Sequence, residues 1–314
     1  IDTRLIAPRD IIGKTLLQIA DEDKTLLVLD CDLGRSTRLS SFEQKFPSRF
    51  IQLGSQEQNA LSVATGLSIA GYHPVLVSFT MFSIGLPWTQ IRMAAYAHVP
   101  FTIIGTHPGF DIGPDGGTHQ MLEDLALARV IPWLDVHTPS DIHETSSAMR
   151  TLIGNDKLNY IRIGRQPVPV YYPAGVKFTP GRADFWMDKG CDVVLIADGS
   201  MIFNAYEAAR MLAEKGMGIS VVNIRSIKPL DEDLILQLSK ESKLIVTIEN
   251  HSIYGGLGGA VAELVSTVGC RLLRIGSQDK FGESASTDEL RVKHGLDSNS
   301  IYLNILKFSF CYKK

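Results

Sequence analysis

Four side chains that can exchange protons or bind hydroxyl groups lie within one short segment, residues 105–120, which reads GTHPGFDIGPDGGTHQ. They are His107, Asp111, Asp115 and His119. The seven glycines and prolines around them predict a loop whose backbone can come close to a bound molecule. We therefore expect general acid–base catalysis and hydroxyl recognition here. A metal site is the weaker interpretation, because the eleven-residue spacing between the two histidines does not by itself bring them together.

A second candidate is Glu57, which lies where a strand-like run at 49–53 gives way to a helix of small residues. An acid in the first turn of a helix ordinarily complements the helix dipole and has no further role. The alanines and glycine of this helix would also let it pack closely against another backbone, which would remove Glu57 from water. A carboxyl group in such a place has a raised pKa and can share a proton with a ring nitrogen.

Three further side chains could bind an anion: Arg9 in PRDIIGK, Ser36 in DLGRST and Arg165 in GRQPVP. Arg165 directly follows a buried strand, so we expect it at a strand end, where open α/β sheets bind their ligands. Phe79 and Phe82 lie three residues apart, a spacing that suits either a core or a platform on which a ring stacks.

The elements that must position these residues alternate between apolar strands and helical patterns along nearly the whole chain. This alternation predicts an α/β fold of doubly wound, mostly parallel sheets covered by helices on both faces. In the first half we expect strands at 25–30, 73–79, 100–107 and 160–163. The helices expected between them lie at 56–70, 87–97, 120–129 and 140–153.

A segment rich in proline and glycine, residues 166–189, interrupts this alternation and predicts a linker. After it the strand-like runs DVVLIADGS, GISVVNI, SKLIVTIEN and RLLRIG alternate again with helical patterns. We therefore place a first domain at 1–165 and a second at 190–314.

The composition excludes several classes of protein. A net charge of −3, from 31 basic and 34 acidic residues, gives no broad basic surface, so nucleic acid is not an expected partner. No apolar run approaches the roughly 18 residues that cross a bilayer, and no signal-peptide core is present, which predicts a cytoplasmic protein with no membrane contact. The cysteines form no C-x-x-C pair, so they predict neither a zinc site nor a disulfide framework. They are Cys31, Cys191, Cys270 and Cys311.

In this order, the segments resemble the second half of transketolase, a thiamine-diphosphate enzyme that moves two-carbon ketol units between sugar phosphates. LGSQEQNALSVATGLSIAG is similar to the family's pyrimidine-domain helix. HPGFDIGPDGGTHQ is similar to its H-D-S-I-G-x-x-x-D-G-x-T-H-Q stretch. The resemblance covers nearly the whole chain and implies a pyrimidine-binding domain followed by the family's C-terminal domain, which serves mainly in dimer packing.

The resemblance implies cofactor-binding roles for four residues. Glu57 would contact the aminopyrimidine ring of thiamine diphosphate, and Phe79 and Phe82 would lie beside that ring, with Phe82 as the stacking partner. Asp32 would lie in the neighbourhood of the cofactor.

The resemblance also implies substrate-binding roles. Asp115 would bind a substrate hydroxyl and His119 the reacting end of the donor, while Glu57, His107 and His119 would take part in catalysis. The residues that would hold the sugar phosphate are Arg9, Ser36, His107 and Arg165.

The chain departs from the family by lacking the diphosphate-binding half, with its G-D-G element and later Asn. We therefore expect thiamine diphosphate, with Mg²⁺ or Ca²⁺, to bind only together with an N-terminal partner subunit, and this chain to hold no metal. Because Ile1 lies close to the first expected helix, we expect that partner to be a separate chain, in an α2β2 assembly that also self-associates through both domains. Pro114 and the LPW at 86–88 differ from the family's pattern.

Other interpretations stay open at this point. The chain could be a deoxyxylulose-phosphate synthase-like fragment, which shares the T-H-Q element, or the β subunit of a 2-oxo acid dehydrogenase, which usually has no sugar-phosphate cluster. It could also be a scaffold subunit without activity. A scaffold has no need of Glu57, His107, Asp115 and His119 together, so the sequence favours an enzyme.

Overall fold

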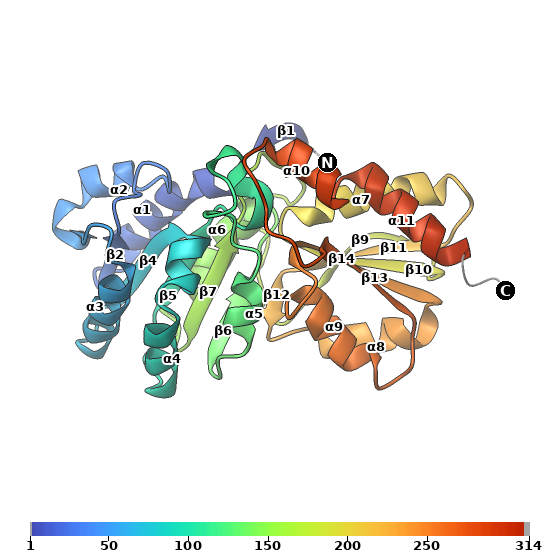
Figure 1. Ribbon diagram of the computed structural model, residues 1–314. Helices are drawn as coiled ribbons and strands as arrows, with labels where there is room; N and C mark the ends of the chain where they lie inside the picture. The colour runs from blue at the N-terminus through green and yellow to red at the C-terminus, as the bar shows by residue number, and fades with distance from the viewer. Residues whose placement is uncertain (1, 311–314) are drawn as a thin grey trace.

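The computed structural model describes residues 2–310, which form two α/β domains side by side (Figure 1). The predicted α/β class with mostly parallel sheets is confirmed. None of the helices in residues 2–310 is both long and apolar enough to cross a membrane.

The first sheet has seven strands and carries the residues of the predicted site. They are β2 (Leu26–Asp30), β3 (Phe50–Gln52), β4 (His73–Phe79), β5 (Thr102–Thr106), β6 (Leu134–His137), β7 (Leu158–Ile163) and β12 (Ser226–Lys228). Their order is β12-β6-β7-β5-β4-β2-β3, and all pairs are parallel except β12 with β6. The central strands are buried along their whole length, as expected of a sheet covered on both faces.

Helices cover this sheet on both faces because side chains alternate along each strand. In β2, Leu26 and Val28 pack on one side and Leu27 and Leu29 on the other. The first side is covered by α1 (Ile12–Glu22), α2 (Ser40–Lys45) and α6 (Ile142–Leu152). The second is covered by α3 (Glu57–Ile69), α4 (Trp88–Tyr96) and α5 (Asp124–Arg129).

The expected helix at 120–129 begins only at Asp124. Gln120 lies outside it because its amide nitrogen donates to the carbonyl oxygens of Gly113 (3.0 Å) and Glu283 (2.9 Å). The glutamine therefore closes the 105–120 loop instead of starting the helix.

The second sheet has five strands in the second domain. They are β9 (Asp184–Lys189), β10 (Val193–Asp198), β11 (Ile219–Ile224), β13 (Leu244–Ser252) and β14 (Leu272–Ser277). Their order is β14-β13-β10-β11-β9, with β9 antiparallel to its neighbour. The helices are α7 (Met201–Ala213), α8 (Glu232–Glu241), α9 (Leu257–Val265), α10 (Thr287–His294) and α11 (Ser298–Phe310).

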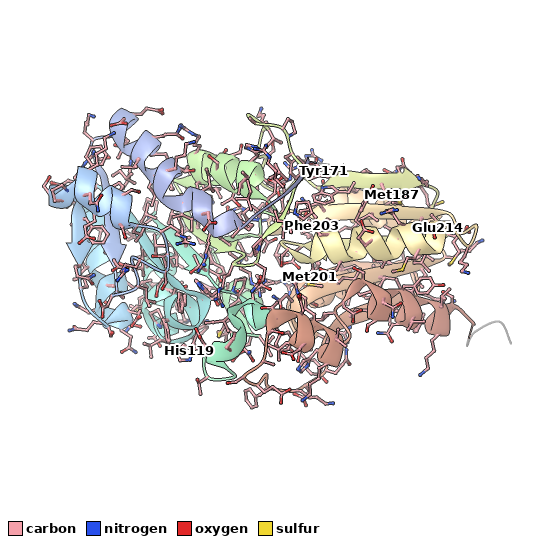
Figure 2. The ribbon with its side chains drawn as sticks, turned by 90° about the horizontal axis from the view of Figure 1, so that it is seen from above. His119, Tyr171, Met187, Met201, Phe203 and Glu214 are labelled. Atoms are coloured by element: carbon pink, nitrogen blue, oxygen red, sulfur yellow. The ribbon has the colours of Figure 1, made fainter. Side chains whose placement is uncertain are left out.

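Helix α7 lies over the second sheet, with Met201 at its end toward the first domain and Glu214 just past the far end (Figure 2). Helix α11 packs beside α7, and α8 and α9 cover the opposite face of the sheet (Figure 1).

The segment 166–189, predicted as a linker, contains two strands. β8 (Val168–Val170) pairs antiparallel with β1 (Asp2–Ile6). Strand β9 lies between Gly181 and Gly190 and has neither proline nor glycine, so it can pair along the edge of β11.

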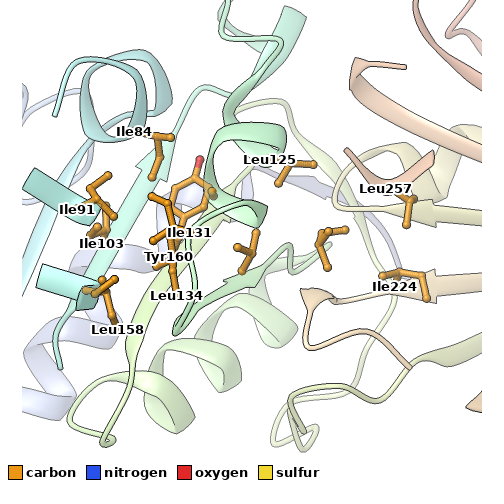
Figure 3. Close-up of a cluster of buried hydrophobic side chains, with 14 of the residues drawn as sticks. Ile84, Ile91, Ile103, Leu125, Ile131, Leu134, Leu158, Tyr160, Ile224 and Leu257 are labelled. Atoms are coloured by element: carbon orange, nitrogen blue, oxygen red, sulfur yellow. The ribbon is translucent and has the colours of Figure 1, made fainter. Parts of the chain in front are cut away.

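One of the three buried hydrophobic clusters spans both domains. Figure 3 shows Ile224 and Leu257 of the second domain beside Leu125, Ile131 and other first-domain side chains. Strand β12 belongs to the second half of the chain, yet it completes the first sheet by pairing with β6. The domains therefore form one continuous structure.

A buried ion pair lies where the domains meet. Arg162 of β7 is 5% exposed, and its Nε donates to Asp124 Oδ2 at 2.7 Å and its Nη2 to Asp124 Oδ1 at 3.1 Å. Tyr160 also donates to Asp124 Oδ2, at 2.8 Å. On the other side Arg162 donates to the carbonyl oxygen of Asn250 (2.8 Å) and lies 4.0 Å from Asp198. Burial raises the pKa of Asp198 to about 6.

We expect Arg162→Met to lower the free energy of unfolding by about 3–5 kcal/mol, because it leaves the buried Asp124 carboxylate without its cation. Urea unfolding followed by circular dichroism measures this change. The control is Arg210→Met on α7, an exposed arginine paired with Glu207, which should cost less than about 1 kcal/mol. Equal costs for the two variants would contradict the role of the buried pair.

Candidate active site

The predicted site residues follow the carboxyl ends of parallel strands in the first sheet. Asp32 follows β2, Phe79 ends β4, His107 follows β5 and Arg165 follows β7. The strand register sets Phe79 opposite Thr106, and Thr106 opposite Ile163. These side chains therefore reach the edge at which open α/β sheets bind ligands.

Glu57 begins helix α3 and is only 5% exposed. Burial raises the pKa of its carboxyl group, and the nearby Asp30 adds to this. Asp30 is itself buried and accepts hydrogen bonds from Gln52 Nε2 (2.7 Å) and the amide of Leu33 (3.2 Å). The close packing expected from the small residues of this helix is present only in its first half: Ala60 and Ala64 are fully buried, whereas Gly66 and Ala70 are exposed.

Cys31 directly follows β2, close to Glu57, and sequence reasoning gave it no role. Burial, with the nearby Glu57 carboxyl group, raises the pKa of this thiol to about 12. The thiol therefore stays protonated at neutral pH and packs as a small apolar side chain.

Aromatic rings connect the candidate residues. The Phe79 and Phe82 rings lie 6.2 Å apart at 20°, and Phe82 is set by a π-helical turn at Met81–Gly85. Phe79 packs against His107, with ring centroids 4.0 Å apart, and Phe82 meets the edge of His119 at 5.4 Å. Figure 2 shows His119 among the loops of the first domain.

His107 and Arg9 are in direct contact. Arg9 Nη1 lies 2.6 Å from His107 Nε2 and donates to the carbonyl oxygen of Ser36 at 3.2 Å. Because a guanidinium can only donate, Nε2 accepts, and the ring proton lies on Nδ1, which donates to Thr106 Oγ1 at 2.8 Å. Burial, then the charges of Arg9, Arg165 and Arg38, lower the pKa of His107 to about 2. The imidazole is therefore neutral at physiological pH.

The remaining predicted residues are positioned less directly. Arg165 Nη1 donates to the carbonyl oxygen of Ile112 at 2.5 Å, while its charge acts on both Arg9 and His107. Ser36, Asp32 and Asp115 are exposed. Asp32 takes a positive φ of 65°, and its amide donates to Gln52 Oε1 at 3.1 Å. His119 is half-buried, with Nδ1 2.9 Å from Thr118 Oγ1.

Sequence reasoning missed the second-domain residues that contact the 105–120 loop, Asn250 and Arg291 among them. Asn250 and Arg291 both reach the buried Asp111 carboxylate, each at 3.0 Å. Asn250 lies near the carboxyl end of β13, in the apolar run SKLIVTIEN, so its place toward a parallel-strand end was a usable signal. Arg291 lies in the polar helix α10, whose sequence gives no sign of this contact.

Across residues 2–310, no group of three or more His, Cys, Asp or Glu is arranged to hold a metal ion. The site offers instead a buried protonatable carboxyl group, a pair of aromatic rings and a group of cations. This donor set fits the ring portion of an aromatic cofactor together with an anionic substrate.

Comparison with known proteins decides the family. Residues 5–170 match the model of the transketolase pyrimidine-binding domain, and residues 182–301 match that of the transketolase C-terminal domain. The chain belongs to the transketolase family. The predicted resemblance to the family's second half is therefore confirmed.

Relatives of this transketolase-family chain include similar part-length proteins. A putative transketolase C-terminal section of Methanocaldococcus jannaschii is 38% identical, with 94% of each chain covered. A 6-deoxy-6-sulfo-D-fructose transketolase subunit of a Clostridium species is 36% identical, covering 93% of this chain and 91% of that protein. A solved split-gene transketolase, described as an inactive beta4 tetramer, is 35% identical with a TM-score of 0.86, over 96% of this chain and 97% of that one.

The depressed pKa of His107 makes stability depend on pH. Below pH 6.5, its ordinary pKa, the unfolded chain takes up a proton that the folded protein does not, so acid lowers the free energy of unfolding. Between pH 7 and pH 5 the free energy of unfolding should fall less in His107→Asn than in the parent protein, by about 1–2 kcal/mol. Urea unfolding at both pH values measures this. His98→Asn, at an exposed position, should follow the parent, and an unchanged slope in His107→Asn would contradict a neutral His107.

Proposed function

We propose that this chain is the C-terminal subunit of a thiamine-diphosphate-dependent transketolase. It would transfer a two-carbon ketol unit from a ketose phosphate to an aldose phosphate. The observation that carries the proposal is the buried Glu57 at the same sheet edge as the Phe79–Phe82 pair and the Arg9–His107 contact. Family membership supports the thiamine chemistry.

Glu57 and Phe82 would hold the aminopyrimidine ring, with Phe79 and Asp32 nearby. Because its pKa is raised, Glu57 can keep a proton and share it with a ring nitrogen. When bound, thiamine diphosphate supplies the carbon nucleophile and the electron sink for the ketol unit. The chain's own contribution is a desolvated proton at a fixed position.

The substrate side would be set by positive charge. Arg9 and Arg165, with Ser36 and His107, would bind the terminal phosphate, since guanidinium groups suit phosphate oxygens. Both ring nitrogens of His107 are engaged, Nδ1 with Thr106 and Nε2 with Arg9, so His107 would reach substrate by exchanging its contact with Arg9. Half-buried His119 beside Phe82 would serve the reacting end of the donor. Exposed Asp115 would accept from a substrate hydroxyl. The clostridial relative is named for a sulfo-sugar. The same arginines would bind an anionic end group other than phosphate equally well.

The cofactor would need a second chain. We propose an N-terminal partner subunit that binds the diphosphate and Mg²⁺ or Ca²⁺, in an α2β2 assembly in the cytoplasm. The relatives described as a section and a subunit, and the split-gene tetramer, support a divided enzyme.

Calorimetry with thiamine diphosphate and Mg²⁺ tests this proposal, first on the chain alone and then with its cognate diphosphate-binding chain. We expect binding only in the mixture. A ketol-transfer assay with xylulose 5-phosphate and ribose 5-phosphate should then show turnover only in the mixture.

Other outcomes would each overturn the proposal in a different way. Tight cofactor binding by the lone chain would contradict the need for a partner. Turnover with pyruvate and glyceraldehyde 3-phosphate would assign deoxyxylulose-phosphate synthesis, and oxidative decarboxylation of a 2-oxo acid would assign a dehydrogenase β subunit. A mixture that binds cofactor without turning over any of these substrates or a 6-sulfo ketose would indicate a scaffold.

Glu57→Gln should lower kcat of the mixture by at least about 100-fold, because an amide cannot hold the carboxyl proton that the ring nitrogen shares. The side chain keeps its size, so the melting temperature should stay close to that of the parent. Glu43→Gln is the matched control, since Glu43 also lies in the first turn of a helix but is exposed. Parent-like turnover in Glu57→Gln would rule out this role.

A further inference from the structure

Residues 108–113 lead directly to Asp115 and His119 and are bound by side chains of the second domain. Asn250 Nδ2 donates to the carbonyl oxygen of Pro108 at 3.2 Å, and Asn250 Oδ1 accepts from the amide of Phe110 at 2.9 Å. Thr287 Oγ1 donates to the carbonyl oxygen of Phe110 at 3.4 Å. The backbone of this segment is therefore held by the other domain.

Asp111 strengthens this attachment because its carboxylate is fully buried. Its Oδ1 accepts from Asn250 Nδ2 and from Arg291 Nη2, each at 3.0 Å, and Ser200 donates to its Oδ2 at 3.4 Å. A buried carboxylate is stable only when it is paired and hydrogen-bonded. All three partners belong to the second domain, so moving the segment away would strand a charge.

Arg165 at the end of the first domain and Gln166 at the start of the 166–189 segment bind the next carbonyl groups of this loop. Arg165 Nη1 donates to the carbonyl oxygen of Ile112 at 2.5 Å, and Gln166 Nε2 to that of Asp111 at 2.9 Å. Arg165 is a proposed phosphate ligand, so the position of the segment also sets the position of that guanidinium.

The backbone at this place is unusual. Gly109 has a φ of 51°, and a Cβ there would overlap the carbonyl oxygen of Asn250. His107 also takes a positive φ, of 58°. Such conformations persist only where the surroundings fix them, and they concentrate at functional sites. Asn250 supplies that constraint from the other domain.

We propose that Asn250 and Arg291 are positioning residues: by binding Asp111 and the backbone of 108–110, they fix the loop that presents Asp115, His119 and Arg165 to substrate. This inference rests on the proposed function. It gives the second domain an indirect part in substrate binding, through the loop of the first domain.

Hydrogen–deuterium exchange of the chain and kinetics of the reconstituted enzyme test the proposal together. In Asn250→Ala, amides at 109–119 should exchange about 10-fold faster or more, because the amide of Phe110 loses its acceptor. KM for the aldose phosphate should rise about 10-fold, while the affinity for thiamine diphosphate changes less than about threefold, since Asn250 does not contact Glu57 or Phe82. A purely structural role would weaken both affinities together.

Arg291→Met should have the same effects because it strands the Asp111 carboxylate. Adding Asp111→Asn removes that charge and keeps the bond from Asn250, so the double variant should recover most of the lost KM. Arg210→Met on α7 is the control and should change neither exchange nor kinetics. If Asn250→Ala does not fold, Arg291→Lys, which keeps the charge but shortens the reach, provides the same readouts.

Unchanged exchange at 109–119 in Asn250→Ala would overturn the proposal. So would faster exchange with unchanged KM and kcat, because the segment would then be held without any use to the reaction. A parent mixture that shows no ketol transfer would instead contradict the proposed function, and the exchange data would still show whether Asn250 holds the segment.

Discussion

One cation removed from water ties the two domains together at the sheet edges that carry the site. Arg162 lies next to the last residue of β7 in the first domain, and it donates both to Asp124 of its own domain and to the backbone of Asn250 in the other. Because a buried guanidinium must satisfy its donors, both neighbours are fixed in place. Asn250, which is held at its carbonyl by Arg162, uses its side chain to hold the 105–120 loop. A structural ion pair and a loop that carries candidate catalytic groups therefore share a residue.

The two sheets use their carboxyl edges differently. In the first, that edge collects Glu57, His107 and the arginines, and part of it stays exposed at Asp32 and Ser36. In the second, the equivalent edge carries Asp198 and Asn250, and first-domain groups fill it: Arg162 lies beside both, and Gly199 donates to the carbonyl oxygen of Thr138. The same type of sheet thus provides a ligand edge in one domain and a docking edge in the other.

Local pattern predicted much of this. The strand expected at 73–79 matches β4, and the helix expected at 56–70 matches α3 within one residue at each end, because period-two and helical patterns reflect burial directly. Glu57 is buried as expected, beside the buried Ala60 and Ala64, although Gly66 and Ala70 of the same helix are exposed. The pairing of Asp111 with Asn250 and Arg291 did not follow, because it joins residues 139 and 180 positions apart. The three-residue strand β12 is too short to give any periodic signal. The roles of the individual site residues stay predictions.

Strand β12 limits where a chain of this kind can be divided into separate proteins. Its residues belong to the second half of the chain but form the outer edge of the first sheet. If the two halves were made as separate proteins, β6 would lose its partner strand. Its unpaired backbone groups could then pair with strands of other chains and cause aggregation. The two domains should therefore be encoded together in one chain. The physical boundary for division lies outside the pair, even though a proline-rich segment within it looks like the natural place to cut.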